Sequence, residues 1–202
     1  MRITGGMYRS RALRAVRGEA TRPTSDRVRE ALFGILASAR ALEGARVLDL
    51  YAGTGALALE ALSRGAESAI LVESSRDAVA VIRANIEALG VAGQASLVPA
   101  DVRRAMDRLL SAGPFDLVLA DPPWALVESG EPARALAELA AGGALRASAW
   151  VVLEHGARTK PPDAAPLSPW ETRRYGDTAL TFYKTGILRP PRSEVAAGSP
   201  SD

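Results

Sequence analysis

The sequence predicts an α/β fold: a seven-stranded, mostly parallel sheet with helices on both faces, a C-terminal antiparallel hairpin and a short N-terminal extension. Short apolar runs alternate with amphipathic stretches from residue 46 onward, and strands separated by helices of this length form parallel sheets. Residues 47–62 have the pattern of a strand, a glycine turn and a helix. A two-residue turn, Gly176-Asp177, separates the last two strand-like runs, and glycine in its first position favours a type II′ hairpin.

The composition excludes several classes of protein. A chain of 202 residues suffices for one domain with a full hydrophobic core and a short additional element. Hydrophobic residues make up 48% of the chain but occur in short runs, and no apolar signal core follows the basic N-terminus, so we expect a cytoplasmic protein without a membrane span. The absence of cysteine excludes disulfides, thiolate zinc sites and cysteine nucleophiles, and we expect no metal.

The first 22 residues carry a local excess of positive charge. Six arginines face one acid there, a charge of +5, so the remaining residues carry −3 of the total of +2. A basic segment on a near-neutral body predicts a polyanionic partner, although these could also be solvated arginines of an arginine-rich chain. Apolar and basic side chains alternate around Gly5-Gly6, which predicts an exposed hairpin or an extended arm.

A helix is predicted to follow this arm. Arg22-Pro23-Thr24-Ser25-Asp26 is typical of a helix start, with Thr24 or Ser25 as the N-cap. One apolar face of the helix is formed by Val28, Ala31, Leu32, Ile35 and Leu36. We therefore expect residues 1–40 to form an arm and a helix packed on a domain of residues 41–185. Residues 186–202 are rich in Pro, Gly and Ser and predict a disordered tail.

The remaining elements follow in a regular order. The parallel strands are predicted at residues 46–50, 68–73, 95–101, 115–121 and 149–155. The helices between them are predicted at residues 56–64, 75–89, 102–110 and 131–141, with Gly65 and Gly90 closing the first two, and the hairpin strands at 170–175 and 178–184. Ligands of such open sheets bind outside the carboxyl ends of the strands, so we expect the site at that edge.

The glycine turn predicts a bound nucleoside. Gly53 and Gly55 lack side chains where the chain leaves the sheet, so the backbone there can approach a ligand closely. Gly53, Gly55 and Ala58 satisfy the relaxed dinucleotide pattern G-x-G-x-x-A, and Glu73 lies near the spacing of the acid that binds a ribose hydroxyl. The turn alone does not identify the nucleoside, and a plain connecting turn is the simplest alternative.

Four successive strands end in a carboxylate: Asp49, Glu73, Asp101 and Asp121. These acids suit a ligand with several donors and a positive charge, such as S-adenosylmethionine. A dinucleotide fits less well, because carboxylates around the turn would repel its pyrophosphate. Acids are also common as helix caps, which is the alternative explanation for their positions.

The tetrapeptide Asp121-Pro122-Pro123-Trp124 follows the fourth strand directly. Two prolines fix the backbone and remove two N–H donors, which leaves carbonyl acceptors in a rigid turn. If Asp121 and the Pro122 carbonyl accept the hydrogens of an exocyclic amine, its nitrogen lone pair can face a sulfonium methyl for in-line transfer. Trp124 offers a face on which a base can stack, whereas the alternative is a structural turn after a strand.

These motifs resemble those of a known family. The order VLDLYAGTG, Glu73, Asp101 and DPPW resembles class I S-adenosylmethionine-dependent methyltransferases that modify amino groups, whose motif is (D/N/S)PP(aromatic). RITGG, RPTSDRVREALF and AGTGALALEALSRGA resemble the guanine-N2 methyltransferases of small-subunit (16S) ribosomal RNA, over residues 2–184. The resemblance implies a Rossmann-like fold, a monomer, and ribosomal RNA or the assembling small ribosomal subunit as partner. Trp124 departs from the more frequent Phe or Tyr and leaves the pocket size open.

The resemblance also implies roles for individual residues. The turn from Asp49 to Gly55 would hold the methionine part of S-adenosylmethionine, Glu73 the ribose and Asp101 the adenine. The full set implied for the cofactor is Asp49, Tyr51, Ala52, Gly53, Thr54, Gly55, Glu73, Ser74, Asp101, Val102 and Asp121. Asp121, Pro122, Pro123 and Trp124 would hold the target guanine. Arg22 to Thr24 would lie over the active site, and RNA contacts are implied for Arg2, Arg9, Arg11, Arg14, Arg22 and Thr24.

Other functions explain fewer residues. Carbon-5 pyrimidine methylation usually needs a cysteine, which the chain lacks. Methylation of adenine N6 or of protein glutamine shares the DPPW logic, but no insert large enough for a target-recognition domain is evident. A dehydrogenase would leave DPPW unexplained, and a non-catalytic RNA-binding module would explain only the basic arm. His155 has no paired acid at a fixed spacing, so we expect a structural or substrate-edge role rather than a general base.

Overall fold

The computed structural model describes residues 1–16 and 26–185, and its seven-stranded sheet confirms the predicted fold class. The strands are β1 Arg46–Leu50, β2 Ser68–Glu73, β3 Ala95–Pro99, β4 Phe115–Ala120, β5 Leu145–Gly156, β6 Ser168–Tyr175 and β7 Thr178–Lys184. Their order in the sheet is β3-β2-β1-β4-β5-β7-β6. The first five strands are parallel, and β7 runs antiparallel between β5 and β6, so the C-terminal hairpin extends one edge.

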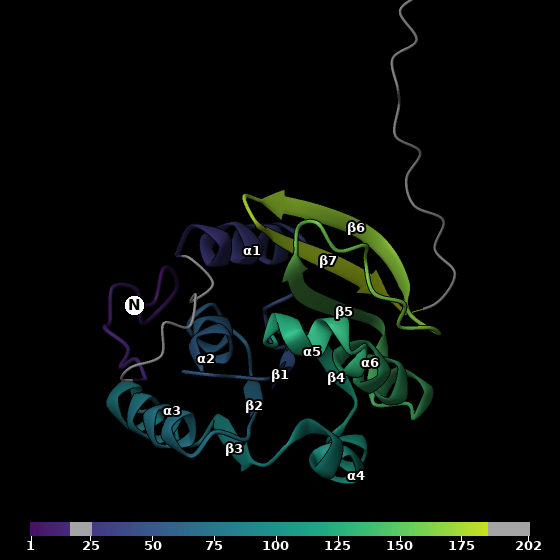
Figure 1. The fold of residues 1–202 in the computed structure, drawn as a ribbon. Helices are drawn as coiled ribbons and strands as arrows, with labels where there is room; N and C mark the ends of the chain where they lie inside the picture. Colours follow the sequence, from purple (N-terminus) through teal and green to yellow (C-terminus); the bar gives the residue numbers. More distant parts are fainter. Residues whose placement is uncertain (17–25, 186–202) are drawn as a thin grey trace, which may run out of the picture.

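Helices cover both faces of this sheet (Figure 1). They are α1 Asp26–Ser38, α2 Ala56–Ser63, α3 Arg76–Leu89, α4 Val102–Ala112, α5 Trp124–Glu128 and α6 Glu131–Ala141. Apolar residues of α1, α2 and α3 form one core with Val47 of β1, whereas those of α4 and α6 form a second core with Leu48 and Leu50 of the same strand. The alternation along each strand therefore assigns its side chains to two separate cores.

Several predicted helix ends are confirmed. The Ser75 hydroxyl accepts a hydrogen bond from the Ala78 N–H at the start of α3, and Gly90 ends that helix with φ of 72°. Gly65 follows α2 with φ of 106°, and Gly176 opens the hairpin turn with φ of 62°. The proposed N-cap residues Thr24 and Ser25 and the proposed tail of residues 186–202 lie outside the described residues.

Some boundaries differ from the predicted ones. Strand β3 ends at Pro99 and β4 at Ala120, so Asp101 and Asp121 lie just beyond the strands instead of inside them. Strand β5 begins at Leu145, before the predicted start at Ala149, and its first residues are mostly exposed. The short helix α5 was not predicted, because five residues are too few to show an apolar period. Within the described residues, no helix is long and apolar enough to span a membrane.

The N-terminal segment, residues 1–16, forms a hairpin-like loop, but two of its apolar residues, Ile3 and Leu13, are not exposed as expected. A bridge pairs Arg2 with Ala12, and Ile3 and Leu13 are buried in the core on the α1 and α2 side. Figure 1 shows this segment beside α2 and above α3. The prediction of an exposed arm is therefore wrong for these side chains, because alternation around a glycine pair does not reveal which side is covered.

A buried carboxylate on α2 holds the N-terminal segment in place. Glu60 is fully buried and accepts hydrogen bonds from the Thr4 N–H and hydroxyl, both at 2.7 Å, and from the Gly5 N–H at 2.8 Å. The Arg64 guanidinium donates to the same carboxylate at 2.7 Å, and Arg29 lies 3.8 Å from it. The RITGG motif thus includes the residues that dock the segment on α2.

Candidate active site

A cavity of about 720 Å³ lies at the carboxyl ends of the parallel strands. The predicted site residues that line it are Tyr51, Ala52, Gly53, Thr54, Glu73, Ser74, Asp101, Val102, Asp121, Pro122, Pro123 and Trp124. The sequence analysis did not single out other lining residues, among them Arg29, Leu57, Ser75, Ala78, Leu126 and Glu154. One cavity therefore joins the glycine turn to the DPPW motif, as the strand order predicts.

The two glycines of the turn are needed for different reasons. Gly53 has φ of 55°, and a Cβ atom added there would meet nothing within 4 Å, so the turn leaves open space beside its backbone. Gly55 has φ of 78°, and its added Cβ would lie 3.0 Å from Leu71 Cδ2. Tyr51 also adopts a positive φ, of 61°, which is unusual for an aromatic residue and marks local strain at this turn. Gly53 thus faces the cavity, whereas Gly55 allows α2 to pack on the sheet.

Glu73 connects the glycine turn to the start of α3. Its Oε2 accepts a hydrogen bond from the Gly53 N–H at 2.7 Å, and its Oε1 accepts from the Ser74 and Ser75 N–H groups at 2.8 Å. A carboxylate has about four lone-pair sites, so it can accept further hydrogen bonds from a ligand. The side chain is held at the cavity wall with acceptor capacity left for hydroxyl groups.

Asp49 lies beneath the turn rather than on the cavity wall. It is fully buried, and its Oδ2 accepts a hydrogen bond from the Ala58 N–H of α2 at 3.0 Å. Its Oδ1 has no hydrogen-bond partner among the described residues. Burial raises the pKa of this carboxyl to about 8, with smaller contributions from Asp121 and Glu73, against the lowering effect of the Ala58 N–H. Asp49, like Gly55, thus shapes the turn without lining the cavity.

Asp101 both caps a helix and lines the cavity. It caps α4, because its Oδ1 accepts a hydrogen bond from the Arg103 N–H at 3.0 Å. It also lines the cavity beside Val102 and Ala100. Because one oxygen suffices for the cap, the same carboxylate can cap the helix and contact a ligand.

The DPPW motif turns directly into α5. Pro123 occupies the N-cap position, and Trp124, the first residue of the helix, is 38% exposed although it is a large apolar side chain. Trp124 also lies against the end of β5, since a Cβ atom added to Gly156 would be 3.7 Å from Trp124 Cε3. The indole ring is therefore positioned by β5 and remains partly accessible at the cavity.

His155 is held inside the sheet and does not line the cavity. It is buried, its Nδ1 lies 3.0 Å from the Gly156 carbonyl oxygen and its Nε2 lies 2.7 Å from Thr181 Oγ1. Because a carbonyl can only accept, Nδ1 carries the proton and Nε2 accepts from the hydroxyl. Burial lowers the pKa of His155, which keeps the ring neutral. These contacts favour the structural role over a general base.

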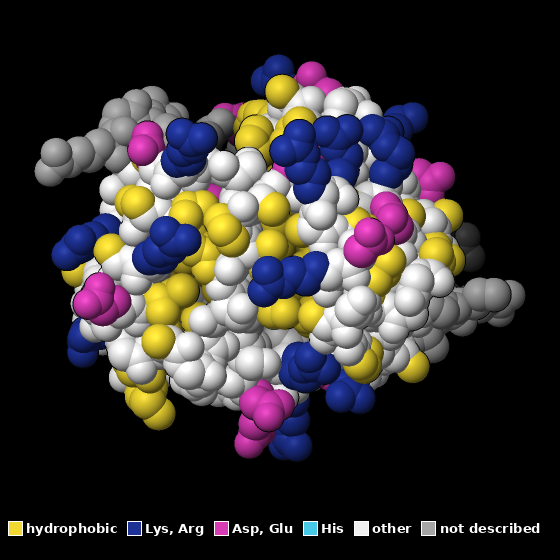
Figure 2. Space-filling model, turned by 90° about the horizontal axis from the view of Figure 1, so that it is seen from below, with side chains coloured by type: hydrophobic (Ala, Val, Ile, Leu, Met, Phe, Trp, Pro, Cys, Tyr) yellow, Lys and Arg dark blue, Asp and Glu magenta, His cyan; other side chains and the backbone are white. Residues whose placement is uncertain are grey.

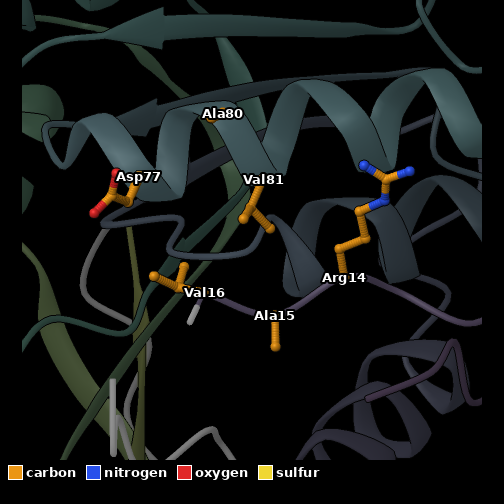
Figure 3. A pocket seen from close by; sticks show the side chains of 6 residues that line it. All are labelled: Arg14, Ala15, Val16, Asp77, Ala80 and Val81. Atoms are coloured by element: carbon orange, nitrogen blue, oxygen red, sulfur yellow. The ribbon is translucent and has the colours of Figure 1, made fainter. Parts of the chain in front are cut away.

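Among the described residues, none of the predicted RNA-binding arginines lines this cavity. Arg2, Arg9, Arg11 and Arg14 are exposed on the N-terminal segment, and Arg22 and Thr24 lie outside the described residues. The Arg11 guanidinium donates to the Ala88 carbonyl at the end of α3. Figure 3 shows Arg14 at one end and Asp77 at the other of a second, more open cavity of about 650 Å³ along α3. On the face carrying α3 and α4, Figure 2 shows basic side chains spread out with acidic ones between them.

Comparisons with known proteins agree with this geometry. A family model described as conserved hypothetical protein 95 matches residues 1–184. YlbH of Bacillus subtilis, provisionally named an rRNA methyltransferase, is 32% identical over 187 residues, which are 91% of this chain and 98% of that protein. Ribosomal RNA small subunit methyltransferase D of Escherichia coli K12 is 42% identical over 125 residues, 61% of this chain and 60% of that protein.

A solved structure of the Escherichia coli protein yhhF, also provisionally named a methyltransferase, superimposes with a TM-score of 0.75 at 35% identity. The match covers 92% of this chain and 97% of that one. The family model and the full-length relative lead to the same assignment. The chain therefore belongs to the conserved hypothetical protein 95 family, that of ribosomal RNA small subunit methyltransferase D.

Proposed function

We propose that the protein transfers a methyl group from S-adenosylmethionine to the exocyclic N2 amino group of a guanine in small-subunit (16S) ribosomal RNA. The observation that carries this proposal is the single cavity that joins the glycine turn to Asp121, Pro122 and Trp124. A cofactor at the turn and a base at the DPPW motif would meet inside it. Proximity of this kind is the main requirement for an in-line transfer between two bound reactants.

The cavity fits S-adenosylmethionine better than a dinucleotide. Its lining includes four acids, Glu73, Asp101, Asp121 and Glu154. The one basic lining residue among those described is Arg29, which is 1% exposed and pairs with Asp26. A negatively charged cavity attracts a sulfonium and an ammonium group and repels a pyrophosphate. Gly53 adds backbone open to a ligand, and Glu73 adds acceptors for ribose hydroxyls.

The chemistry required of the protein is positioning. When bound, S-adenosylmethionine supplies an electrophilic methyl group on a positively charged sulfur. Asp121 and the Pro122 carbonyl would accept the two N–H groups of the guanine amine, which directs the nitrogen lone pair away from the ring. The nitrogen forms a bond to the methyl carbon as the carbon–sulfur bond breaks, and the amine then releases one proton to Asp121 or to water. Trp124 would stack on the base.

The substrate class rests on the family. Two relatives, 32% and 42% identical over the matched residues, carry names that refer to ribosomal RNA. We infer that ribosomal RNA or the assembling small subunit is also the substrate of this chain. The exposed arginines of the N-terminal segment would contact its phosphates. We also keep the expectation that the protein acts as a monomer. Methylation of adenine N6 or of a protein glutamine is the competing activity, since the same motif could hold either amine.

Mass spectrometry of ribosomal RNA tests the proposal. Small-subunit RNA from cells that lack the gene should miss one N2-methylguanosine that is present in the parent cells. The intact gene should restore it, and a gene encoding Asp121→Ala should not. An unchanged nucleoside profile, or the loss of N6-methyladenosine instead, would contradict the guanine-N2 assignment.

A further inference from the structure

Glu154 is a buried acid to which the function above assigns only a share of the negative charge of the cavity. It lies in β5 next to the end of β4, because the register pairs Ala120 with Leu153 and the next residues of the two strands are Asp121 and Glu154. Val152, two positions earlier, belongs to the core on the α1 and α2 side, so the alternation directs Glu154 to that same face. Glu154 and Asp121 both line the cavity.

The surroundings of Glu154 indicate a binding role rather than a solvated edge. The residue is 7% exposed, although it is an acid at the end of a strand. Two residues later, Gly156 lies against Trp124, so one strand end positions both the carboxylate and the ring proposed to stack on the base. A carboxylate beside a base site can supply hydrogen-bond acceptors to the N–H groups of the base.

Guanine presents two kinds of N–H group side by side, the N2 amine and the ring N1–H. If Asp121 and the Pro122 carbonyl hold the amine, the adjacent donor on the same edge is N1–H. We propose that Glu154 accepts the hydrogen bond from guanine N1–H and is a specificity-determining residue of this site. The proposal rests on the amino-group methylation inferred above, and it adds which amines the site accepts as substrates.

The same contact would exclude the competing substrates. The N6 amine of adenine has an acceptor, N1, beside it, and the N4 amine of cytosine has the acceptor N3. The side-chain amine of glutamine has a carbonyl oxygen beside it. In each case an acceptor would face the Glu154 carboxylate, and two acceptors in contact leave a buried group without a hydrogen bond. Only guanine among these offers an N–H at that position.

The analogue 2-aminopurine tests this contact directly. It keeps the C2 amine of guanine, but its N1 is an acceptor. Two versions of an RNA fragment are needed, one with the guanosine mapped by mass spectrometry and one with 2-aminopurine in its place. For the parent protein we expect kcat/KM to be on the order of a hundredfold higher for the guanosine fragment, because a site built for an N–H rejects an analogue that lacks it.

The variant Glu154→Gln should reduce this preference by about tenfold or more, because the amide can donate a hydrogen bond to the N1 acceptor. Glu138→Gln is the matched control, since it removes the same charge from an exposed position on α6. Its preference should equal that of the parent. Cofactor binding, measured by calorimetry with S-adenosylhomocysteine, should be retained in both variants and shows that each is folded.

The outcomes separate the two proposals. If the parent transfers no methyl group to the C2 amine of the guanosine fragment, amino-group methylation of guanine is wrong. If it does, but Glu154→Gln keeps the parental preference, only the role of Glu154 is wrong. Should Glu154→Gln fail to fold, Glu154→Asp withdraws the carboxylate and should also lower the preference. A parent protein that uses both fragments equally would overturn the proposal without any variant.

Discussion

Two glycine-containing turns contact α2, and they differ in what lies in front of them. At the N-terminal turn, a Cβ atom added to Gly6 would lie 1.8 Å from the Ser63 carbonyl oxygen, so the backbone there packs against protein. At the turn after β1, a Cβ atom added to Gly53 would meet nothing within 4 Å. The sequence shows a glycine pair in both places. Only the second turn leaves space for a ligand, and it does so at Gly53.

The acids beside these turns differ in the same way. Glu60 and Asp49 are both fully buried. Glu60 accepts hydrogen bonds on both oxygens from the N-terminal segment and Arg64, whereas Asp49 has one oxygen without a partner among the described residues. Buried polar groups normally have hydrogen-bond partners. A buried oxygen with unused hydrogen-bonding capacity therefore distinguishes a functional region from a structural one better than burial does. The first turn should therefore affect stability and the second should affect function.

The largest effect is expected at the structural acid. Glu60→Ala leaves Arg29 buried and removes the acceptor for Thr4 and Gly5, so it should lower the free energy of unfolding by about 3–5 kcal/mol. Urea denaturation followed by circular dichroism measures this change. Glu67→Ala, which removes an exposed acid, is the control and should have little effect. If the two variants were equally stable, the Glu60 contacts would not hold the segment in place.

At the cavity, substitutions are expected to lower the methylation rate rather than the stability of the fold. Asp121→Ala removes a hydrogen bond to the amine in the transition state, which should lower the methylation rate by about a hundredfold to a thousandfold. The fold and the affinity for S-adenosylmethionine should be retained, as measured by melting and calorimetry. Asp121→Asn should cost less, because its amide oxygen can still accept the bond. Methylation at nearly the parental rate by Asp121→Ala would show that the DPPW turn is structural.

Alanine at the two glycines compares the turns directly. Gly6→Ala should lower the free energy of unfolding by at least about 2 kcal/mol, because the methyl group collides with Ser63 and φ is positive. Gly53→Ala meets only the backbone strain of about 1–2 kcal/mol, but its methyl group enters the cavity and should weaken cofactor binding. Melting temperatures and calorimetry measure both effects. If both variants lost the same stability and Gly53→Ala bound the cofactor as the parent does, the distinction between a structural turn and a ligand-binding turn would be wrong.

A further effect, on stability, depends on pH. The pKa of Asp49 is raised to about 8, so between about pH 4 and pH 8 the folded protein binds a proton that the unfolded chain has lost. This contribution to stability is present at low pH and decreases as the pH rises toward 8. Asp49→Asn cannot ionise and should lack this decrease, so its melting temperature should rise relative to the parent between pH 5 and pH 8.5. Parallel curves would contradict the raised pKa.

The sequence predicted local features well and long-range contacts poorly. The glycine turn, the strand-end acids and the DPPW motif are contiguous or follow the strand order, and the structure brings most of them to one cavity. Glu60 lies 56 positions from Thr4, and no local pattern connects them. The available signal was an acid inside the apolar helix ALALEALS, all of whose residues are buried. Glu154 gave a similar signal, an acid near the end of an apolar strand.

The smallest effects are expected on the N-terminal segment, where the comparison extends to its arginines. Arg9 is exposed, whereas Arg11 donates a hydrogen bond to the carbonyl of Ala88 and so is partly used by the protein. If Arg9 contacts a phosphate, Arg9→Gln should weaken RNA binding and reduce the slope of log K against log salt by about one. Arg11→Gln should cost at most about 1 kcal/mol of stability as well. Cofactor binding should not change in either variant.

The exposed Arg104 on α4 provides the matched control for this measurement, because Arg104→Gln removes the same charge from a different part of the surface. Filter binding of ribosomal RNA at several salt concentrations gives the slope for each variant. A general effect of net charge would reduce the salt slope equally in Arg9→Gln and Arg104→Gln. A phosphate contact made by Arg9 would reduce the slope in Arg9→Gln but not in Arg104→Gln. Equal slopes for the parent, Arg9→Gln and Arg11→Gln would return these arginines to the role of solvated surface charges and leave RNA binding to other residues.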